Sequence, residues 1–140
     1  MIKIKILFVG KTKEKWLEEA CSEYLKRLSP VIQVYFAWAR DTPQLIDWAQ
    51  KEESIISLDP KGETFTSEEF SHYLAGQWEK QGGRLTLIIG GAEGLPKEIK
   101  ERGNLISLSS LTFTHQITRL ILIEQIYRAS EIQKGSSYHK

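Results

Sequence analysis

The sequence predicts an α/β fold, in which a mostly parallel sheet of five to six strands carries helices on both faces. Short apolar segments alternate five times with segments whose apolar residues recur at helical spacing, a pattern typical of parallel strand–helix–strand units. The chain has 140 residues, 41% of them hydrophobic, and no repeat or linker divides it. We therefore expect a single domain over residues 1–140.

The first strand is predicted over residues 2–9, where alternating isoleucine and lysine give way to a continuous apolar run that Gly10 ends. A helix follows over residues 16–28, with apolar residues three and four apart, and Ser29-Pro30 stops it. Residues 31–38 are apolar enough for the next strand.

The second helix is predicted from Thr42-Pro43, because threonine is a good N-cap and proline fits the first helical turn. A third strand is expected over residues 54–59, and Pro60-Lys61-Gly62 would then turn the chain.

The best-specified local feature is the start of the third helix. Thr66 and Glu69 have the spacing of a capping box, and Phe65 and Phe70 have that of a hydrophobic staple. Gln81-Gly82-Gly83 is expected to end this helix.

Residues 85–127 hold the expected ligand site. A buried strand over 85–89 breaks at Gly90-Gly91, and Pro96 begins a short helix. A strand over 105–108 then runs into a loop rich in serine and threonine. Two such strand ends, each followed by a helix, are where an open α/β sheet binds ligands.

The last helix is predicted to begin near His115. Its apolar residues cover far more than one face, so a second surface must bury them. Deep burial within the domain is one explanation, and self-association through residues such as Ile123 and Ile126 is the one we favour. A homodimer is therefore expected.

Charge and cysteine content exclude a strongly basic nucleic-acid-binding tail and an internal disulfide. The net charge is only +1, but residues 97–140 carry seven basic and four acidic side chains, so the half that holds the site is basic. The single cysteine, Cys21, cannot form an internal disulfide. No secretory signal or membrane segment is recognisable, which predicts a cytoplasmic protein.

The glycine turn that follows residue 89 matches neither of two common nucleotide motifs. No Lys-Ser/Thr pair follows, as a Walker site requires, and the next strand ends in Ser109-Ser110 instead of a ribose-binding acid.

No set of residues has the spacing of metal ligands, so no metal is expected. His72 is expected to be solvated, and His115 either shapes the loop or takes part in the chemistry. His139 lies in a tail whose tyrosine, histidine and lysine suit RNA chemistry.

Three stretches carry a resemblance to a known family: LIIGGAEGLPKEI, ISLSSLTFTH and RLILIEQIYRASEIQKGSSYHK. With the KIKILFVGK start and the SLDPKG turn, they resemble the ribosomal RNA large subunit methyltransferase H family, small members of the trefoil-knotted SPOUT methyltransferases. The resemblance implies S-adenosyl-L-methionine as cofactor, a homodimer and a knot near the C-terminus. It also implies methylation of N3 of a pseudouridine in helix 69 of 23S ribosomal RNA, within the large subunit or the assembled ribosome.

The resemblance also implies a set of site residues. Those expected to contact the cofactor are Leu58, Gly90, Gly91, Ser109, Ser110, Leu111, Thr112, Phe113 and Thr114. In the tail, His139 is the candidate base or proton relay, and Tyr138 would stack on the target base or bond to its edge. Arg128, Lys134 and Lys140 are expected to meet RNA phosphates.

Two other functions remain open at this point. The first is a non-catalytic ribosome-binding factor that has kept a ligand pocket. The second is 2′-O-methylation of transfer RNA by a related knotted fold. It is disfavoured because such enzymes generally need an arginine near the cofactor, and no arginine lies between Arg102 and Arg119 in the region of the expected knot.

Overall fold

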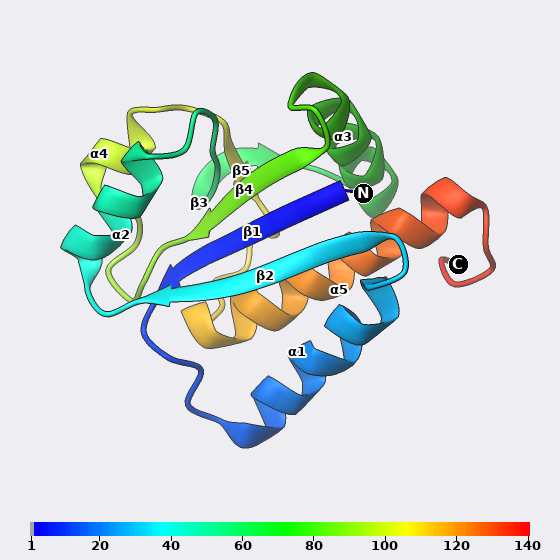
Figure 1. The fold of residues 1–140 in the computed structure, drawn as a ribbon, viewed down its shortest axis with the longest axis horizontal. Coiled ribbons are helices and arrows are strands. Elements are labelled where there is room, and N and C mark those ends of the chain that lie inside the picture. Colours follow the sequence, from blue (N-terminus) through cyan, green and yellow to red (C-terminus); the bar gives the residue numbers. More distant parts are fainter. Residues whose placement is uncertain (1) are drawn as a thin grey trace.

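The computed structural model describes residues 2–140, along which strands and helices alternate as the sequence predicts (Figure 1). The elements are β1 (Ile2–Val9), α1 (Lys15–Leu28), β2 (Ile32–Ala39), α2 (Thr42–Gln50), β3 (Ile56–Thr64), α3 (Ser67–Lys80), β4 (Arg84–Ile89), α4 (Lys97–Lys100), β5 (Leu105–Ser107) and α5 (His115–Lys134). None of these helices combines the length and the apolar content that a bilayer crossing requires.

The strands form one parallel sheet in the order β2-β1-β4-β3-β5, which confirms the α/β class with five strands. Helices α1, α3 and α5 cover one face, and α2 and α4 cover part of the other (Figure 1). Side chains of β1 alternate between the two layers: Ile4, Ile6 and Phe8 join the first core, whereas Leu7 joins the second. Such two-sided burial explains the continuous apolar run at the end of this strand.

The predicted start of α3 is confirmed. The Thr66 Oγ1 atom accepts a hydrogen bond from the Glu69 amide at 3.1 Å, and the Glu69 carboxylate accepts one from the Thr66 amide at 2.8 Å. The rings of Phe65 and Phe70 lie 6.3 Å apart across this turn. The capping box and the hydrophobic staple are therefore both present, as the sequence predicts.

The N-cap predicted for α2 is wrong by one residue. Asp41, and not Thr42, has the extended backbone of a cap, and its carboxylate accepts a hydrogen bond from the Gln44 amide at 2.9 Å. Thr42 is the first residue of the helix. Aspartate is at least as good a cap as threonine, so sequence chemistry alone allowed either choice.

The third strand does not end at Asp59 as predicted. Strand β3 continues to Thr64, and Ile106 of β5 pairs with both Leu58 and Glu63 of β3 across a register shift. A Cβ atom on Gly62 would lie 2.5 Å from backbone atoms of Ile106. The segment predicted to turn the chain therefore passes directly over β5, at a distance that only glycine permits.

The central part of the wide apolar surface of α5 is buried within the chain. Leu122, Ile123 and Ile126 are fully buried where α5 packs against the sheet, α1 and α3. The prediction that a second copy covers Ile123 and Ile126 is therefore wrong. A helix near the end of the chain is here enclosed because two other helices share its face of the sheet.

A buried arginine joins the start of α5 to the end of β1. Arg119 is fully buried, with its guanidinium 3.8 Å from the centre of the Phe8 ring. It donates hydrogen bonds to the carbonyls of Val9 and Gly10, each at 3.0 Å, and to the Thr12 hydroxyl at 2.9 Å. Burial lowers the pKa of Arg119 to about 10, which still leaves the group charged at neutral pH.

Replacing Arg119 by methionine should lower the free energy of unfolding by about 2 to 4 kcal/mol, because the carbonyls of Val9 and Gly10 at the end of β1 lose their donors while the packing on Phe8 is largely kept. Urea denaturation would measure the change. Arg128→Met is the control, since Arg128 is only partly buried and its ion pair should contribute less than about 1 kcal/mol. Equal losses in the two variants would contradict a special role for Arg119.

Candidate active site

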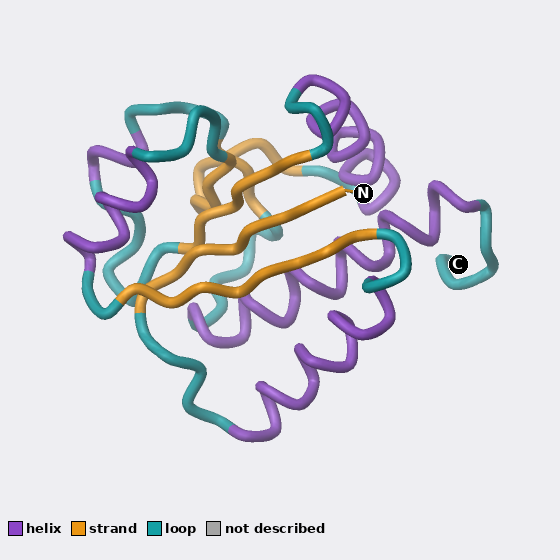
Figure 2. The backbone as a smooth tube through the Cα atoms, in the orientation of Figure 1, coloured by secondary structure: helices purple, strands orange, loops and turns teal. Residues whose placement is uncertain are grey.

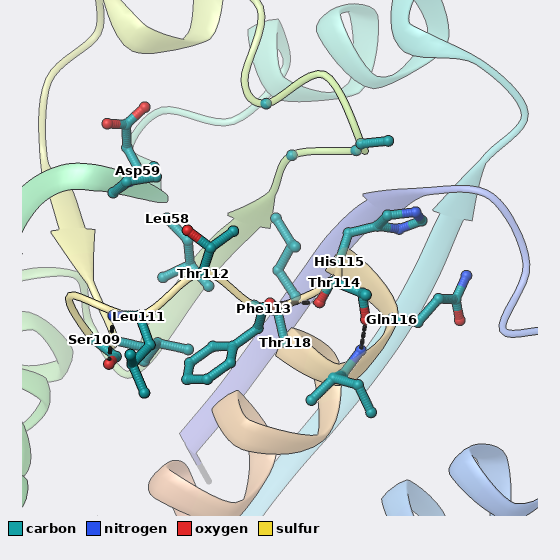
Figure 3. Close-up of a pocket in the computed structure, with 18 of the residues that line it drawn as sticks. Leu58, Asp59, Ser109, Leu111, Thr112, Phe113, Thr114, His115, Gln116 and Thr118 are labelled. Carbon is teal, nitrogen blue, oxygen red and sulfur yellow. Dashed lines mark hydrogen bonds between the residues drawn. The ribbon is translucent and has the colours of Figure 1, made fainter.

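A pocket of about 730 Å³ opens at the carboxyl ends of β4 and β5 and at residues 58–60 of β3, beside the start of α5 (Figure 3). This edge is where an open parallel sheet places ligands. The pocket brings together eight of the nine residues predicted to contact the cofactor, which come from three separate segments: Leu58, Gly90, Gly91, Ser109, Leu111, Thr112, Phe113 and Thr114. The ninth, Ser110, is exposed and is not among the lining residues.

The two glycines of the turn after β4 have different roles. A Cβ atom on Gly90 would lie 2.6 Å from the carbonyl carbon of Gly94, so the turn itself requires glycine there. A Cβ atom on Gly91 would meet nothing closer than the Cβ of Val9 at 4.0 Å. The protein does not need glycine at position 91 for its own packing, and the missing side chain leaves space in the pocket.

The loop after β5 uses its hydroxyl groups to hold its own shape. The Ser107 hydroxyl donates to the Ser109 carbonyl at 2.9 Å, and the Ser109 hydroxyl accepts from the Leu111 amide at 3.0 Å. The Thr114 hydroxyl caps α5 by accepting from the Ile117 amide at 3.2 Å. Side chains therefore order this loop, which borders the pocket.

The loop keeps backbone donors and apolar surface for a ligand. Among residues 2–140, the amides of Thr112 and Phe113 have no hydrogen-bond partner. Leu111 is 73% exposed, although it lies at the pocket. Free amides beside apolar side chains suit an uncharged heterocycle such as adenine.

His115, the first residue of α5, lines the pocket as well. Figure 3 shows its ring turned away from Thr112 and Phe113. Its Nδ1 atom is buried and has no hydrogen-bond partner in residues 2–140. Burial lowers the pKa of His115, and the charges of Arg119 and Lys13 lower it further, so the imidazole is neutral at neutral pH.

The predicted catalytic residues of the tail are not among the lining residues of their own chain's pocket. Figure 2 shows the tail leaving the end of α5 that is opposite to His115, and a helix of 20 residues is about 30 Å long. The tail folds back along α5, where the Tyr138 hydroxyl donates to Glu124 at 2.8 Å. His139 lies between Arg128 at 3.1 Å and Glu68 at 3.2 Å.

These contacts limit what the tail can do in this conformation. Burial and the Glu124 carboxylate raise the pKa of Tyr138, so its phenol remains protonated and is a hydrogen-bond donor. Two of the predicted phosphate-binding cations already have carboxylate partners, Arg128 with Glu124 at 2.9 Å and Lys134 with Glu131 at 3.1 Å. Lys140 is exposed and has no ion pair in the described part of the chain.

The pocket also includes residues that sequence reasoning did not assign to it. Asp59 is buried beside Leu58, where it accepts a hydrogen bond from the Lys61 amide at 2.9 Å and lies 3.4 Å from the Lys100 ammonium. Trp16, the first residue of the helix predicted over 16–28, is 54% exposed at the pocket. An acid that directly follows a buried strand was a usable signal for Asp59, whereas no local pattern marks Trp16.

Comparison with known proteins agrees with this arrangement. Residues 2–139 match a family described as "Predicted SPOUT methyltransferase". Ribosomal RNA large subunit methyltransferase H of Protochlamydia amoebophila is 62% identical over 140 residues, with both chains covered completely. The proteins of that name from Streptococcus uberis and Carboxydothermus hydrogenoformans are 40% and 38% identical, and each alignment covers 99% of this chain and 100% of the relative.

Solved structures support the fold alone. A probable methylase family protein from Haemophilus influenzae has a TM-score of 0.51 at 9% identity, over 96% of this chain and 66% of its own. TrmJ from Z. mobilis has a TM-score of 0.52 at 9% identity, over 92% of this chain and 70% of its own. On the evidence of sequence and fold together, the chain belongs to the SPOUT methyltransferases, in the family of ribosomal RNA large subunit methyltransferase H.

Proposed function

We propose that this protein transfers a methyl group from S-adenosyl-L-methionine to N3 of a pseudouridine in helix 69 of 23S ribosomal RNA, in the cytoplasm. The observation that carries the proposal is the convergence of three distant segments, around residues 58, 90 and 109–114, on one pocket. The names of the relatives support large-subunit ribosomal RNA as the substrate. The resemblance of the sequence to this family supports the choice of base and atom.

The pocket residues fit this cofactor. The space left by Gly91 lets backbone approach a ligand, and the amides of Thr112 and Phe113 are free to bind the edge of an adenine ring. Leu58 and Leu111 provide apolar contacts on the same pocket. When bound, S-adenosyl-L-methionine would supply a methyl group already activated on a sulfonium, so the protein has to orient the base and accept a proton.

We infer that the proton acceptor is His139 and that it acts in the pocket of a second copy. This inference rests on the position of the tail, which in its own chain folds onto Glu124 and Glu68 and not into the pocket. In a homodimer, Tyr138 could donate a hydrogen bond to the target base while Arg128, Lys134 and Lys140 meet phosphates. His115 is the alternative proton acceptor, because it is neutral and lines the pocket of its own chain.

We also propose that the chain is knotted around β5. The support is the double pairing of Ile106 with Leu58 and Glu63, together with the contact between Gly62 and the backbone of Ile106. Residues 59–62 thus pass over β5, and the chain beyond β5 continues into the pocket loop and α5. Threading of this kind is a rare exception among protein folds.

The proposed reaction predicts one specific modification. Mass spectrometry of 23S RNA fragments should find one additional methyl group on a helix 69 pseudouridine in cells that contain the gene, and none in cells that lack it. Addition of the purified protein and S-adenosyl-L-methionine to ribosomes from the deletion strain should restore the mass. A ribosome-binding factor without activity would leave the mass unchanged in both experiments.

Replacing Gly91 by valine should abolish S-adenosyl-L-methionine binding in a protein that still folds, because the new side chain enters open pocket space without a backbone clash. Isothermal titration calorimetry would measure the affinity, and thermal unfolding would verify the fold. Gly76→Ala, on α3, is the control and should bind normally. Unchanged affinity in a folded Gly91→Val protein would remove this turn from the site.

Deleting residues 138–140 should leave cofactor affinity nearly intact and lower methyl transfer by roughly 10²- to 10⁴-fold, the usual cost of losing an acid–base group. A mixing experiment tests whether the tail acts on a second copy. The Gly91→Val chain keeps its tail and the truncated chain keeps its pocket, so mixed dimers should regain activity that neither chain has alone. A mixture that exchanges subunits but stays inactive would favour a tail that serves its own chain. Normal activity of the truncated protein would contradict the role of the tail and leave His115 as the candidate proton acceptor.

A further inference from the structure

The connection between β1 and α1, residues 10–16, borders the pocket at a place that the proposed chemistry does not use. Its sequence is GKTKEKW, and both Glu14 and Trp16 line the pocket. Lys11, Lys13 and Lys15 are all exposed. Three positive charges and one negative charge give this short segment a net charge of +2.

The lysines of this segment are available to a ligand. Lys11 and Lys13 have no ion pair within residues 2–140. Lys15 lies 4.0 Å from Glu19, and both side chains are exposed, so this pair contributes almost nothing. Flexible ammonium groups without carboxylate partners are suited to the phosphates of a nucleic acid.

The backbone of the segment is held in place, although its charged side chains are free. Arg119 binds the carbonyl of Gly10 and the hydroxyl of Thr12, and the Gln116 amide donates to the Lys11 carbonyl at 3.4 Å. Both anchoring residues belong to the first turns of α5, which also line the pocket. The position of the lysines is thereby tied to the position of the pocket.

Trp16 adds an aromatic surface at the same place. More than half of its side chain is exposed, at 54%, while the next residue, Leu17, is fully buried. An exposed indole beside a pocket, with lysines around it, is the combination that proteins use to stack an unpaired base and bind its phosphates. The core of a protein–protein interface is usually apolar, whereas the surface around Trp16 carries lysines, so its charge favours RNA as the partner.

We propose that residues 11–16 form a second RNA-binding edge of the pocket, in which Trp16 stacks on an unpaired base next to the target and Lys11, Lys13 and Lys15 contact the phosphates. The inference rests on the proposed function, since it takes the substrate to be ribosomal RNA. It assigns substrate recognition to a segment at the opposite end of the chain from the tail. The pocket would then be flanked by RNA contacts from both ends of the sequence.

The test compares two triple variants in binding to bacterial large ribosomal subunits. Lys11→Gln, Lys13→Gln and Lys15→Gln together should weaken binding and reduce the slope of log affinity against log salt concentration by roughly 2, at about 0.7 for each phosphate contact. Lys26→Gln, Lys51→Gln and Lys80→Gln together remove the same charge from exposed sites elsewhere and should leave the slope nearly unchanged. Filter binding over a range of salt concentrations measures both.

The stacking role has its own variant. Trp16→Ala should weaken binding by roughly 5- to 100-fold, and Trp16→Phe should recover most of the loss because a smaller ring still stacks. Thermal unfolding would verify that both proteins fold as the wild type does. Wild-type affinity and salt slope in the lysine triple variant, or equal losses in the two triple variants, would overturn the proposal.

The binding experiment is independent of the reaction. A wild-type protein that methylates ribosomes while the Lys11, Lys13 and Lys15 variants bind normally would leave the proposed function standing and remove this surface. A wild-type protein that binds through these residues but transfers no methyl group would support this RNA-binding surface and overturn the proposed function. Failure of the wild type to bind large subunits at all would overturn the surface directly.

Discussion

The contact between Gly62 and the backbone of Ile106 is the constraint on which the site depends. Because a Cβ atom would stand 2.5 Å from Ile106, β3 can approach the backbone of β5 this closely only through a residue without a side chain. This close approach pairs β5 with β3 up to Ser107, and the loop of residues 108–114 begins directly after it. That loop meets the Gly90 turn and Leu58 in one pocket because β5, β4 and β3, to which they belong or from which they follow, are neighbours in the same sheet.

The pocket and the charged groups around it are separated along the chain. Hydroxyl groups such as those of Ser109 and Thr114 are used to shape the loop and cap a helix, so recognition inside the pocket falls to backbone amides and apolar side chains. Exposed cations without a close ion pair in residues 2–140 lie on other segments: Lys11, Lys13 and Lys15 follow β1, and Lys140 is in the tail. Asp59 is the buried acid of this pocket, and under the proposed function a small cofactor and a polyanion are bound by different parts of one site.

Features that depend on neighbours in sequence could be predicted, and features that depend on distant contacts could not. The capping box at Thr66 and the alternation of strands and helices are encoded within a few residues, and both are confirmed. The burial of Ile123 was misjudged because it depends on α1 and α3, which lie far away in sequence. The extension of β3 past Asp59 depends likewise on β5, since a Pro-Lys-Gly sequence taken alone indicates a turn. Five of the six loop residues chosen by family resemblance, all but Ser110, line the pocket, whereas Trp16 carried no local signal.

The bonds of Arg119 join residues between 107 and 110 positions apart, which has a consequence for the order of events during synthesis. Strand β1, which leads into residues 10–12, is made first. Arg119, which anchors these residues, emerges from the ribosome only when most of the chain has been translated. Such long-range closure is slow compared with local helix formation. Residues 10–12 must therefore stay without this anchor until α5 has been made, so the pocket cannot form on a translation product that ends before α5.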